Sequence, residues 1–249
     1  VEATLARFRT VDYEETFEPA DGVAAELHDA GHILGSASVV LDLTRAGRER
    51  RLLFSGDVGR RGLPILRDPR HPPGADVVIM ESTYGDRDHA PASRAKEVLA
   101  ECADHVVERR GMLLVPAFAL GRTQEVVYRL NQLWHEGRIR RLPIWVDSPL
   151  ATNVTEVFRD HPECYDAEML RALRTESDAD PLGFETLTYT RTVEESKALN
   201  DREGPGVIIA ASGMCEAGRI LHHLRNHGTK PTSLVLFVGY QAEHTLGRK

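Results

Sequence analysis

Hydrophobic and polar positions alternate with a period of two in the first third of the chain. Residues 23–27 alternate in this way, and residues 36–43 are rich in β-branched side chains, so both stretches are predicted to be strands. The polar residues 44–48 predict a hairpin turn that leads into a third strand at 52–54. Residues 77–80 form a continuous apolar run of strand length, which predicts a strand buried on both faces.

Helical periodicity takes over after residue 85. Apolar side chains recur at helical spacing over residues 94–109 and again in a helix that opens at residues 121–124. Residues 150–200 are predicted to be mostly helical, and a further helix is predicted over residues 216–227. Short apolar runs predict strands at residues 112–115, 144–146, 207–210 and 234–238. Strands that alternate with helices imply a largely parallel, doubly wound sheet.

The change of pattern divides the chain near residue 86. We therefore predict a protein of the α/β class with two domains, residues 1–86 and residues 87–249. A chain of 249 residues is long enough for one large domain or two modest ones. Its hydrophobic content of 41% and charged content of 28% are ordinary for a soluble globular protein.

Charge and cysteine content narrow the function classes. The net charge of -7 gives no general signal for binding polyanions, so any nucleic-acid site must be a local basic groove on an acidic body. The three cysteines are scattered and form no CxxC, which argues against a disulfide framework or a thiolate zinc site and fits a reducing cytosol. No apolar run approaches the roughly 18 residues of a membrane span. We therefore expect a cytoplasmic protein without a membrane segment.

Three apolar runs in the first domain are followed by one polar residue of metal-ligand type. His32 and Asp57 each follow a glycine, and Glu81 directly follows the run at residues 77–80. Taken singly, each has an ordinary explanation: a loop histidine, a turn-forming aspartate, and a glutamate that caps the next helix or loop. Taken together, they suggest a metal or acid–base site, because imidazole and carboxylate suit zinc and a carboxylate can bridge two ions. A zinc site needs at least three protein ligands, however, and no HxH or HxxxH on a strand or loop completes this one.

Seven short segments of the chain carry a family resemblance. They are AGHILGS at 30–36, FSGDVGR at 54–60, ESTYG at 81–85, PAFALGRTQE at 116–125, VDSPLA at 146–151, ASGM at 211–214 and GYQAE at 239–243. In this order they resemble the successive motifs of the β-CASP branch of the metallo-β-lactamase-fold nucleases. That branch includes bacterial and archaeal ribonucleases, the endonuclease of eukaryotic pre-mRNA 3′-end cleavage, and DNA-processing members. The SGM and GYQAE forms are more similar to the RNA-acting members.

The resemblance implies a fold and a set of site residues. Residues 1–86 would be part of a metallo-β-lactamase αββα sandwich, and residues 87–249 an inserted Rossmann-like β-CASP domain with a mainly parallel sheet, incomplete at its C-terminal end. His32 would bind one zinc ion, and Asp57 would bridge two zinc ions. Glu81 would be the family's acidic residue that hydrogen-bonds a histidine at the leaving oxygen. The catalytic residues implied within the chain are therefore Asp57 and Glu81.

The chain also departs from the pattern of the family. The HxHxDH ligand cluster would precede residue 1, and two later histidine motifs would follow residue 249. The sequence is therefore interpreted as the middle of a longer protein that supplies two of about seven metal ligands. By itself it is expected neither to retain zinc stoichiometrically nor to cut RNA. His244 stands where relatives usually have glycine.

The second domain contains candidate substrate contacts. Arg122, Ser212 and Gly213 are predicted to lie at strand-to-helix junctions, where free N–H groups and the positive helix end favour phosphate. Ser148 belongs to the VDSPLA motif, and Arg219 lies on the predicted helix after the SGM motif. An ordinary tight turn remains an alternative explanation for Ser212 and Gly213. Two further groups of residues are predicted to face solvent. They are His223 and His227, and the acidic residues at 163–180.

These observations favour a zinc-dependent ribonuclease that hydrolyses RNA phosphodiester bonds. Two zinc ions would activate hydroxide, and single-stranded RNA would lie in a cleft between the domains, which admits a strand more easily than a duplex. A homodimer is compatible with the resemblance. Two alternatives stay open: a catalytically inactive relative that binds RNA or scaffolds a processing complex, and a metallo-β-lactamase-fold hydrolase of a small thioester or lactone.

Overall fold

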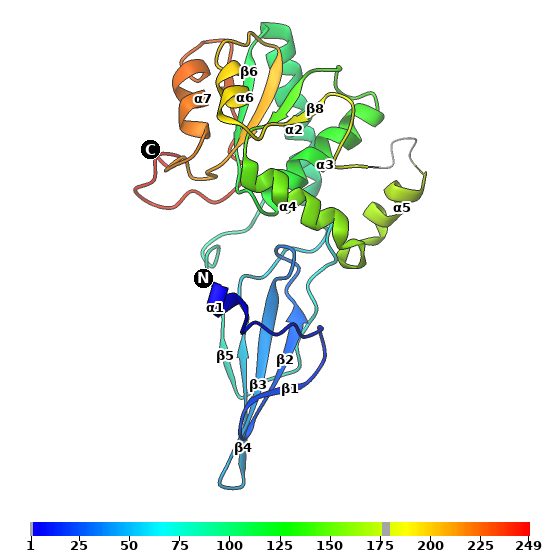
Figure 1. The fold of residues 1–249 in the computed structure, drawn as a ribbon, viewed down its shortest axis with the longest axis vertical. Coiled ribbons are helices and arrows are strands. Elements are labelled where there is room, and N and C mark those ends of the chain that lie inside the picture. The colour runs from blue at the N-terminus through cyan, green and yellow to red at the C-terminus, as the bar shows by residue number, and fades with distance from the viewer. Residues whose placement is uncertain (1, 176–179) are drawn as a thin grey trace. The chain divides into compact units, whose positions relative to one another are not determined.

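The computed structural model describes residues 2–175 and 180–249. Internal contacts divide the chain into two compact units, Val1–Asp88 and His89–Lys249, and each has a sheet of its own (Figure 1). We call them unit 1 and unit 2. The sequence predicted a mixed α/β protein, and this class is confirmed. In the part of the chain that is described, none of the helices combines the length and the apolar character needed to cross a bilayer.

Unit 1 is a strand-rich unit with one five-stranded sheet. The sheet order is β1-β2-β3-β4-β5, and every neighbouring pair is antiparallel except β4 and β5, which are parallel. Its elements are α1 (Glu2–Leu5), β1 (Phe17–Ala20), β2 (Val23–Asp29), β3 (Ala37–Arg45), β4 (Arg48–Phe54) and β5 (Val77–Ile79). The predicted hairpin is confirmed: Arg45 pairs with Arg48 across a two-residue turn, Ala46 and Gly47, in which both residues have positive φ.

The strand at residues 77–79 exists, but the prediction that it is buried on both faces is wrong. Val77, Val78 and Ile79 are 47%, 52% and 51% exposed, and Met80 after them is 67% exposed. Strand β5 is the last strand of its sheet, and because successive side chains point to opposite faces, their similar exposure means that the described residues cover neither face of β5. A continuous apolar run therefore identified the strand but not its environment.

Close backbone approaches hold the loops of unit 1 together. The Gly59 N–H donates a hydrogen bond of 2.8 Å to the Ala30 carbonyl. A Cβ atom on Gly59 would lie 1.8 Å from the carbonyl oxygen of Gly31, far inside contact distance. Only glycine therefore allows the loop after β4 to meet the loop after β2 in this arrangement.

Unit 2 is built on a five-stranded sheet in which every neighbouring pair is parallel. The sheet order is β10-β6-β9-β7-β8, so the predicted parallel sheet is confirmed. Its strands are β6 (Met112–Pro116), β7 (Ile144–Val146), β8 (Leu187–Tyr189), β9 (Gly206–Ala210) and β10 (Leu234–Val235). Its helices are α2 (Ala92–Arg109), α3 (Arg122–His135), α4 (Pro149–Asp160), the short 3-10 helix η1 (Pro162–Cys164), α5 (Ala167–Thr175), α6 (Val193–Ala198) and α7 (Ile220–His227).

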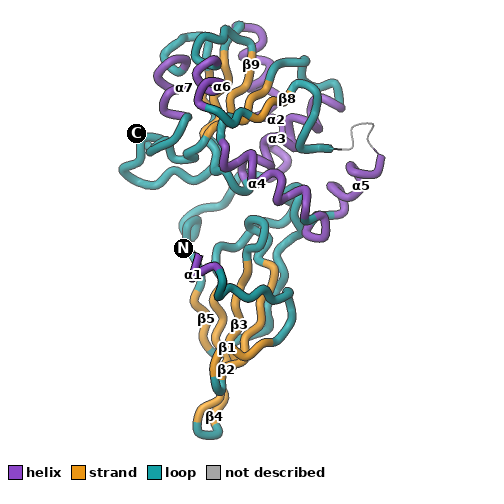
Figure 2. Tube along the Cα trace, in the orientation of Figure 1, coloured by secondary structure: helices purple, strands orange, loops and turns teal. Residues whose placement is uncertain are grey.

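The sheet of unit 2 is covered on both faces. All five residues of β6 and of β9 are buried, although successive side chains of a strand point to opposite faces. On one face, Met112, Leu114 and Ile208 form a core cluster with Ile220 of α7. Helices α2 and α3 contact one another, and α2 also contacts β6 and β9. Figure 2 shows these helices and strands as the predicted doubly wound arrangement.

Three element bounds in unit 2 differ from the prediction. Strand β8 lies within the stretch predicted to be mostly helical, of which residues 176–179 lie outside the described residues. Strand β10 covers only Leu234–Val235. Helix α7 begins at Ile220 and not at residue 216, because Cys215 and Gly218 have φ of 58° and 80°, which no right-handed helix accommodates. Residues 211–219 therefore form a loop.

The contact between Gly59 and Gly31 leads to a prediction about stability. Gly59→Ala should lower the free energy of unfolding by about 1–3 kcal/mol, because the new Cβ atom must displace backbone. Gly74→Ala is the matched control, since a Cβ at Gly74 would meet nothing within 4 Å. Its effect should stay within about 1 kcal/mol. Urea denaturation of both variants measures the difference, and equal unfolding midpoints would contradict the described approach of the two loops.

Candidate functional site

The three candidate residues of unit 1 follow strands that point the same way. Strand β2 is antiparallel to β3, and β3 is antiparallel to β4, so β2 and β4 run in one direction; β5 is parallel to β4. The carboxyl ends of β2, β4 and β5 therefore lie at one edge of the sheet. His32, Asp57 and Glu81 come two or three residues after these ends. The structure thus brings the three predicted residues to the same sheet edge.

Glu81 is the most strongly held of the three. Its Oε1 accepts a hydrogen bond of 3.0 Å from the Val58 N–H, and its Oε2 accepts one of 3.4 Å from the Thr83 N–H. Its own N–H donates to the Ser55 hydroxyl at 3.1 Å. The Val58 N–H foremost, then Thr83 and the nearby His32, hold the pKa of Glu81 below its usual value. Glu81 is thus an ionised carboxylate that fixes the loop carrying Asp57.

Asp57 and His32 have side chains that remain available. Asp57 is exposed, and within residues 2–175 and 180–249 nothing forms a hydrogen bond or an ion pair with its carboxylate. The His32 backbone N–H donates to the Ser36 hydroxyl at 3.1 Å, which orders its loop, while the imidazole is half-buried. An unpaired carboxylate and an imidazole beside a fixed glutamate are groups that can bind a cation.

The donor atoms at this edge fit zinc in kind but not in number. Imidazole nitrogen and carboxylate oxygen are both zinc ligands, and a zinc site takes at least three protein ligands. No group of three or more His, Cys, Asp or Glu side chains that could hold a metal ion occurs among the described residues. Among the described residues, His32 and Asp57 therefore supply only some of the ligands that a zinc site needs.

The predicted substrate contacts of unit 2 also gather at one edge. Because all strands of its sheet are parallel, the loops after β6, β7 and β9 leave the same edge, and these three strands are neighbours in the order β6-β9-β7. Arg122, Ser148, Ser212, Gly213 and Arg219 all lie in or directly after these loops. In open α/β sheets, ligands bind outside this edge.

Arg122 starts helix α3 but is already paired. Its guanidinium forms an ion pair with Glu125 on the same helix, and about a third of its side chain is exposed. The preceding Gly121 N–H donates to Gln124 Oε1 at 2.8 Å, so this amide of the helix start is also used. Gln124 is held in turn by the Ala119 carbonyl and the Thr155 hydroxyl. The start of α3 is therefore a closed cap and not an open set of donors.

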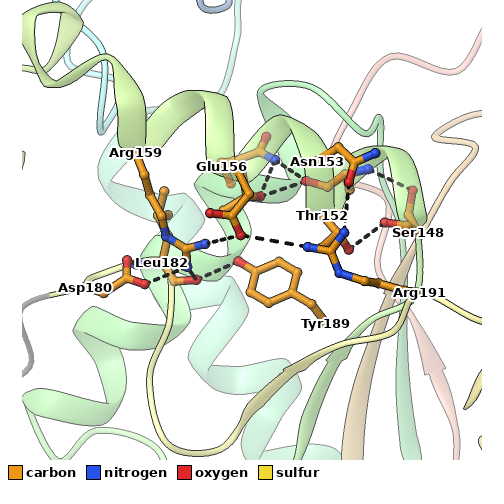
Figure 3. A network of polar contacts seen from close by, with 12 residues as sticks. Ser148, Thr152, Asn153, Glu156, Arg159, Asp180, Leu182, Tyr189 and Arg191 are labelled. Carbon is orange, nitrogen blue, oxygen red and sulfur yellow. Dashed lines mark hydrogen bonds and ion pairs between the residues drawn. The ribbon is translucent and has the colours of Figure 1, made fainter.

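Ser148 has a clear structural role as the N-cap of helix α4. Its hydroxyl oxygen accepts a hydrogen bond of 3.2 Å from the Ala151 N–H, and the residue is buried. Figure 3 shows how polar contacts continue along α4: Arg191 donates to Asn153 at 3.0 Å, and Arg159 pairs with Asp180 at 2.6 Å. These contacts tie α4 to the segments on either side of β8.

Asp180, in the acidic segment that was predicted to face solvent, is thus part of an ion pair.

Ser212 and Gly213 lie in the loop after β9, well before the start of α7. The Ile220 N–H at the start of α7 donates to the carbonyl of the neighbouring Ala211 at 3.1 Å, so the helix start lies beside this loop. The Ser212 oxygen accepts hydrogen bonds from the Glu216 N–H at 3.1 Å and the Ala217 N–H at 3.3 Å, and among the described residues its own proton has no acceptor. A Cβ on Gly213 would lie 2.8 Å from the Phe118 ring, so a larger residue here would have to displace that ring.

Asp147, a buried carboxylate of unit 2 with four side-chain partners, was not among the predicted site residues. It directly follows β7 and is completely buried. Its carboxylate contacts His223 Nε2 at 2.6 Å, the Ser196 hydroxyl at 2.6 Å, Arg219 Nη1 at 2.8 Å and the Thr190 hydroxyl. Burial alone would raise the pKa of Asp147, but these partners hold it well below its usual range. We call Asp147 and these four partners the Asp147 cluster.

The prediction that His223 and His227 face solvent is wrong, since both are completely buried. His227 Nε2 lies 3.0 Å from the Leu199 carbonyl, and burial foremost lowers the pKa of His227.

Asp147 could have been found in the sequence by the signal that identified Asp57. Both are aspartates that follow an apolar strand, Asp147 directly after β7 and Asp57 after the Ser-Gly pair that follows β4.

Comparison with known proteins places this geometry in context. The sequence model of the Beta-Casp domain family matches residues 123–249 of this chain. Ribonuclease TTHA0252 of Thermus thermophilus is 38% identical over 99% of this chain and 55% of its own length. Endoribonuclease YSH1 of Kluyveromyces lactis is 30% identical over 97% of this chain and 31% of its own length. Transcription termination factor FttA of Methanosarcina mazei is 31% identical over 100% of this chain and 39% of its own length.

The chain thus spans between about a third and about half of the length of these relatives. The family match covers just over half of the chain and contains the all-parallel sheet from β7 onward with the Asp147 cluster. Together with the parallel sheet, this match settles the family. The protein belongs to the Beta-Casp domain family.

Proposed function

We propose that this chain is part of a zinc-dependent ribonuclease that hydrolyses RNA phosphodiester bonds. The observation that carries the proposal is the meeting of His32, Asp57 and Glu81 at one sheet edge, with Asp57 unpaired and Glu81 ionised. The names of two relatives, a ribonuclease and an endoribonuclease, support the same reaction. The chain covers only part of each relative, so the reaction is proposed for the complete protein.

Each residue of unit 1 has a distinct proposed role. His32 would hold one zinc ion, and Asp57 would bridge two, because a carboxylate has two oxygens that can bind separate ions. Bound ions of this kind supply an activated water and neutralise charge on the attacking and leaving oxygens. Glu81 would keep the Asp57 loop in place through Val58 and orient a neighbouring histidine, as carboxylates around metal sites do.

The loops of unit 2 are proposed to hold the RNA backbone. Ser212 has a hydroxyl proton free to donate to a phosphate oxygen, and Gly213 lets the backbone approach closely. Arg122 would contribute charge by exchanging Glu125 for phosphate. Ser148 would act from the same edge, and Arg219 would support the loop that carries Ser212. Single-stranded RNA is the proposed substrate form, and a homodimer the proposed assembly.

The role of Asp57 leads to a test on the complete protein. Asp57→Asn should abolish cleavage of single-stranded RNA and lower the bound zinc, because the substitution removes a charged ligand shared by two ions. Asp12→Asn is the matched control, since Asp12 is also an exposed aspartate of unit 1. It should leave both quantities unchanged. Cleavage assays with metal analysis measure the two effects, and an active, zinc-loaded Asp57→Asn protein would refute the bridging role.

Glu81 is expected to behave differently from Asp57. Glu81→Gln should slow RNA cleavage by about 10- to 100-fold, as is typical when a group that orients a metal site is changed. The zinc content should remain close to that of the unaltered protein, because Glu81 is not proposed as a ligand. The same two assays distinguish the roles. Loss of zinc from the folded Glu81→Gln protein would contradict the proposed separation between the role of Glu81 and that of the zinc ligands.

A further inference from the structure

The Asp147 cluster joins three loops of unit 2 at a single buried carboxylate. Thr190 follows β8, Ser196 lies in α6, and Arg219 and His223 lie at the start of α7 and within it, while Asp147 itself follows β7. The cluster therefore reaches every element that leaves the sheet edge at β7, β8 and β9. The Asp147 side chain is completely buried, and that of Arg219 is 19% exposed.

Arg219 links this cluster to the loop that carries Ser212. One guanidinium nitrogen of Arg219 pairs with Asp147 at 2.8 Å, and the other donates to the Arg191 carbonyl at 3.1 Å. The loop of residues 211–219 is closed on itself just before Arg219. The Ile220 N–H donates to the Ala211 carbonyl at 3.1 Å, and the Ser212 N–H donates to the Ala217 carbonyl at 3.0 Å. A displacement of Arg219 would therefore move the loop as a unit.

The chemistry of the cluster points to positioning more than to stability. A buried ion pair is weak support for stability, because desolvation offsets most of the attraction, but it allows only one arrangement of its partners. Here the arrangement determines where the 211–219 loop lies. The loop offers the Ser212 hydroxyl, whose oxygen already accepts two N–H groups and whose proton is free to be donated. Donors fixed in advance bind an anion without the cost of ordering them.

The guanidinium of Arg219 is also poorly placed to act on RNA directly. Within the described residues, its guanidinium donates to the Asp147 carboxylate and to the Arg191 carbonyl, and four-fifths of the side chain is buried. Arg219 was predicted as a substrate contact, and its geometry favours a supporting role. We propose that Asp147 is a positioning residue for RNA: through Arg219 it fixes the 211–219 loop so that the Ser212 hydroxyl meets a phosphate of the bound strand. This inference rests on the proposed function of the same edge.

A double-mutant cycle on the complete protein tests the inference. Asp147→Asn keeps the size of the side chain but removes the charge that holds Arg219. It should raise the KM for single-stranded RNA by about tenfold and change kcat by less than about threefold, the pattern expected when binding alone is lost. Ser212→Ala should raise KM similarly. Because both act through one contact, the double variant should be no worse than the more severe single variant.

Independent effects would overturn the proposal. If the two increases in KM multiply in the double variant, Asp147 does not act through Ser212. The control for a general loss of stability of unit 2 is Leu130→Ala, which truncates a completely buried side chain of α3 outside the Asp147 cluster. The control and Asp147→Asn are compared at temperatures equally far below their melting points. A rise in KM of the same size in Leu130→Ala would also overturn the proposal.

A second variant covers the case in which Asp147→Asn does not fold. Arg219→Lys keeps a cation beside Asp147 but loses the second contact, to the Arg191 carbonyl. It should raise KM severalfold and again be non-additive with Ser212→Ala; additivity here would overturn the proposal. If the unaltered protein binds RNA but does not cut it, the proposed hydrolysis fails. The positioning role is then tested by the RNA dissociation constants of the same variants. Increases that multiply in the double variant would overturn it.

Discussion

The hydrogen bond between the Gly59 N–H and the Ala30 carbonyl is the constraint on which the candidate site of unit 1 depends. At 2.8 Å it joins the loop after β4 to the loop after β2, and thereby brings the segments of Asp57 and His32 together. Glu81 completes the arrangement by accepting from the Val58 N–H, one residue after Asp57. Three loops that are distant in sequence are thus fixed by one backbone hydrogen bond and by the Glu81 carboxylate, while the Asp57 and His32 side chains remain available.

At the edge of its own sheet, unit 2 relies mainly on contacts between side chains. Its loops are held by side chains, above all by the buried Asp147 carboxylate, while Ser212 keeps a donor available. Several groups that looked like free ligands in the sequence are committed to the fold. Gly121 and Gln124 close the start of α3, and Ser148 caps α4. The phosphate-binding role that we propose for this edge therefore falls mainly on the loop after β9.

The sequence predicted much of this architecture because local patterns specify it. The hairpin at Ala46 and Gly47, the parallel sheet and the strand ends beside His32, Asp57 and Glu81 all follow from periodicity and turn residues. Features that depend on contacts between distant segments could not be predicted. The exposure of Val77–Ile79 depends on which segments cover the two faces of β5, and none of the described ones does so. The burial of His223 follows from its contact with Asp147, which lies 76 residues away in sequence.

The dependence of RNA cleavage on metal tests the central claim most directly. The complete protein is freed of metal with a chelator, dialysed, and assayed on single-stranded RNA before and after zinc is added back. Since the proposed residues activate water only with bound cations, cleavage should disappear with the metal and return with zinc. Cleavage that persists at the original rate in the metal-free protein would contradict the assignment of His32 and Asp57 to a metal site.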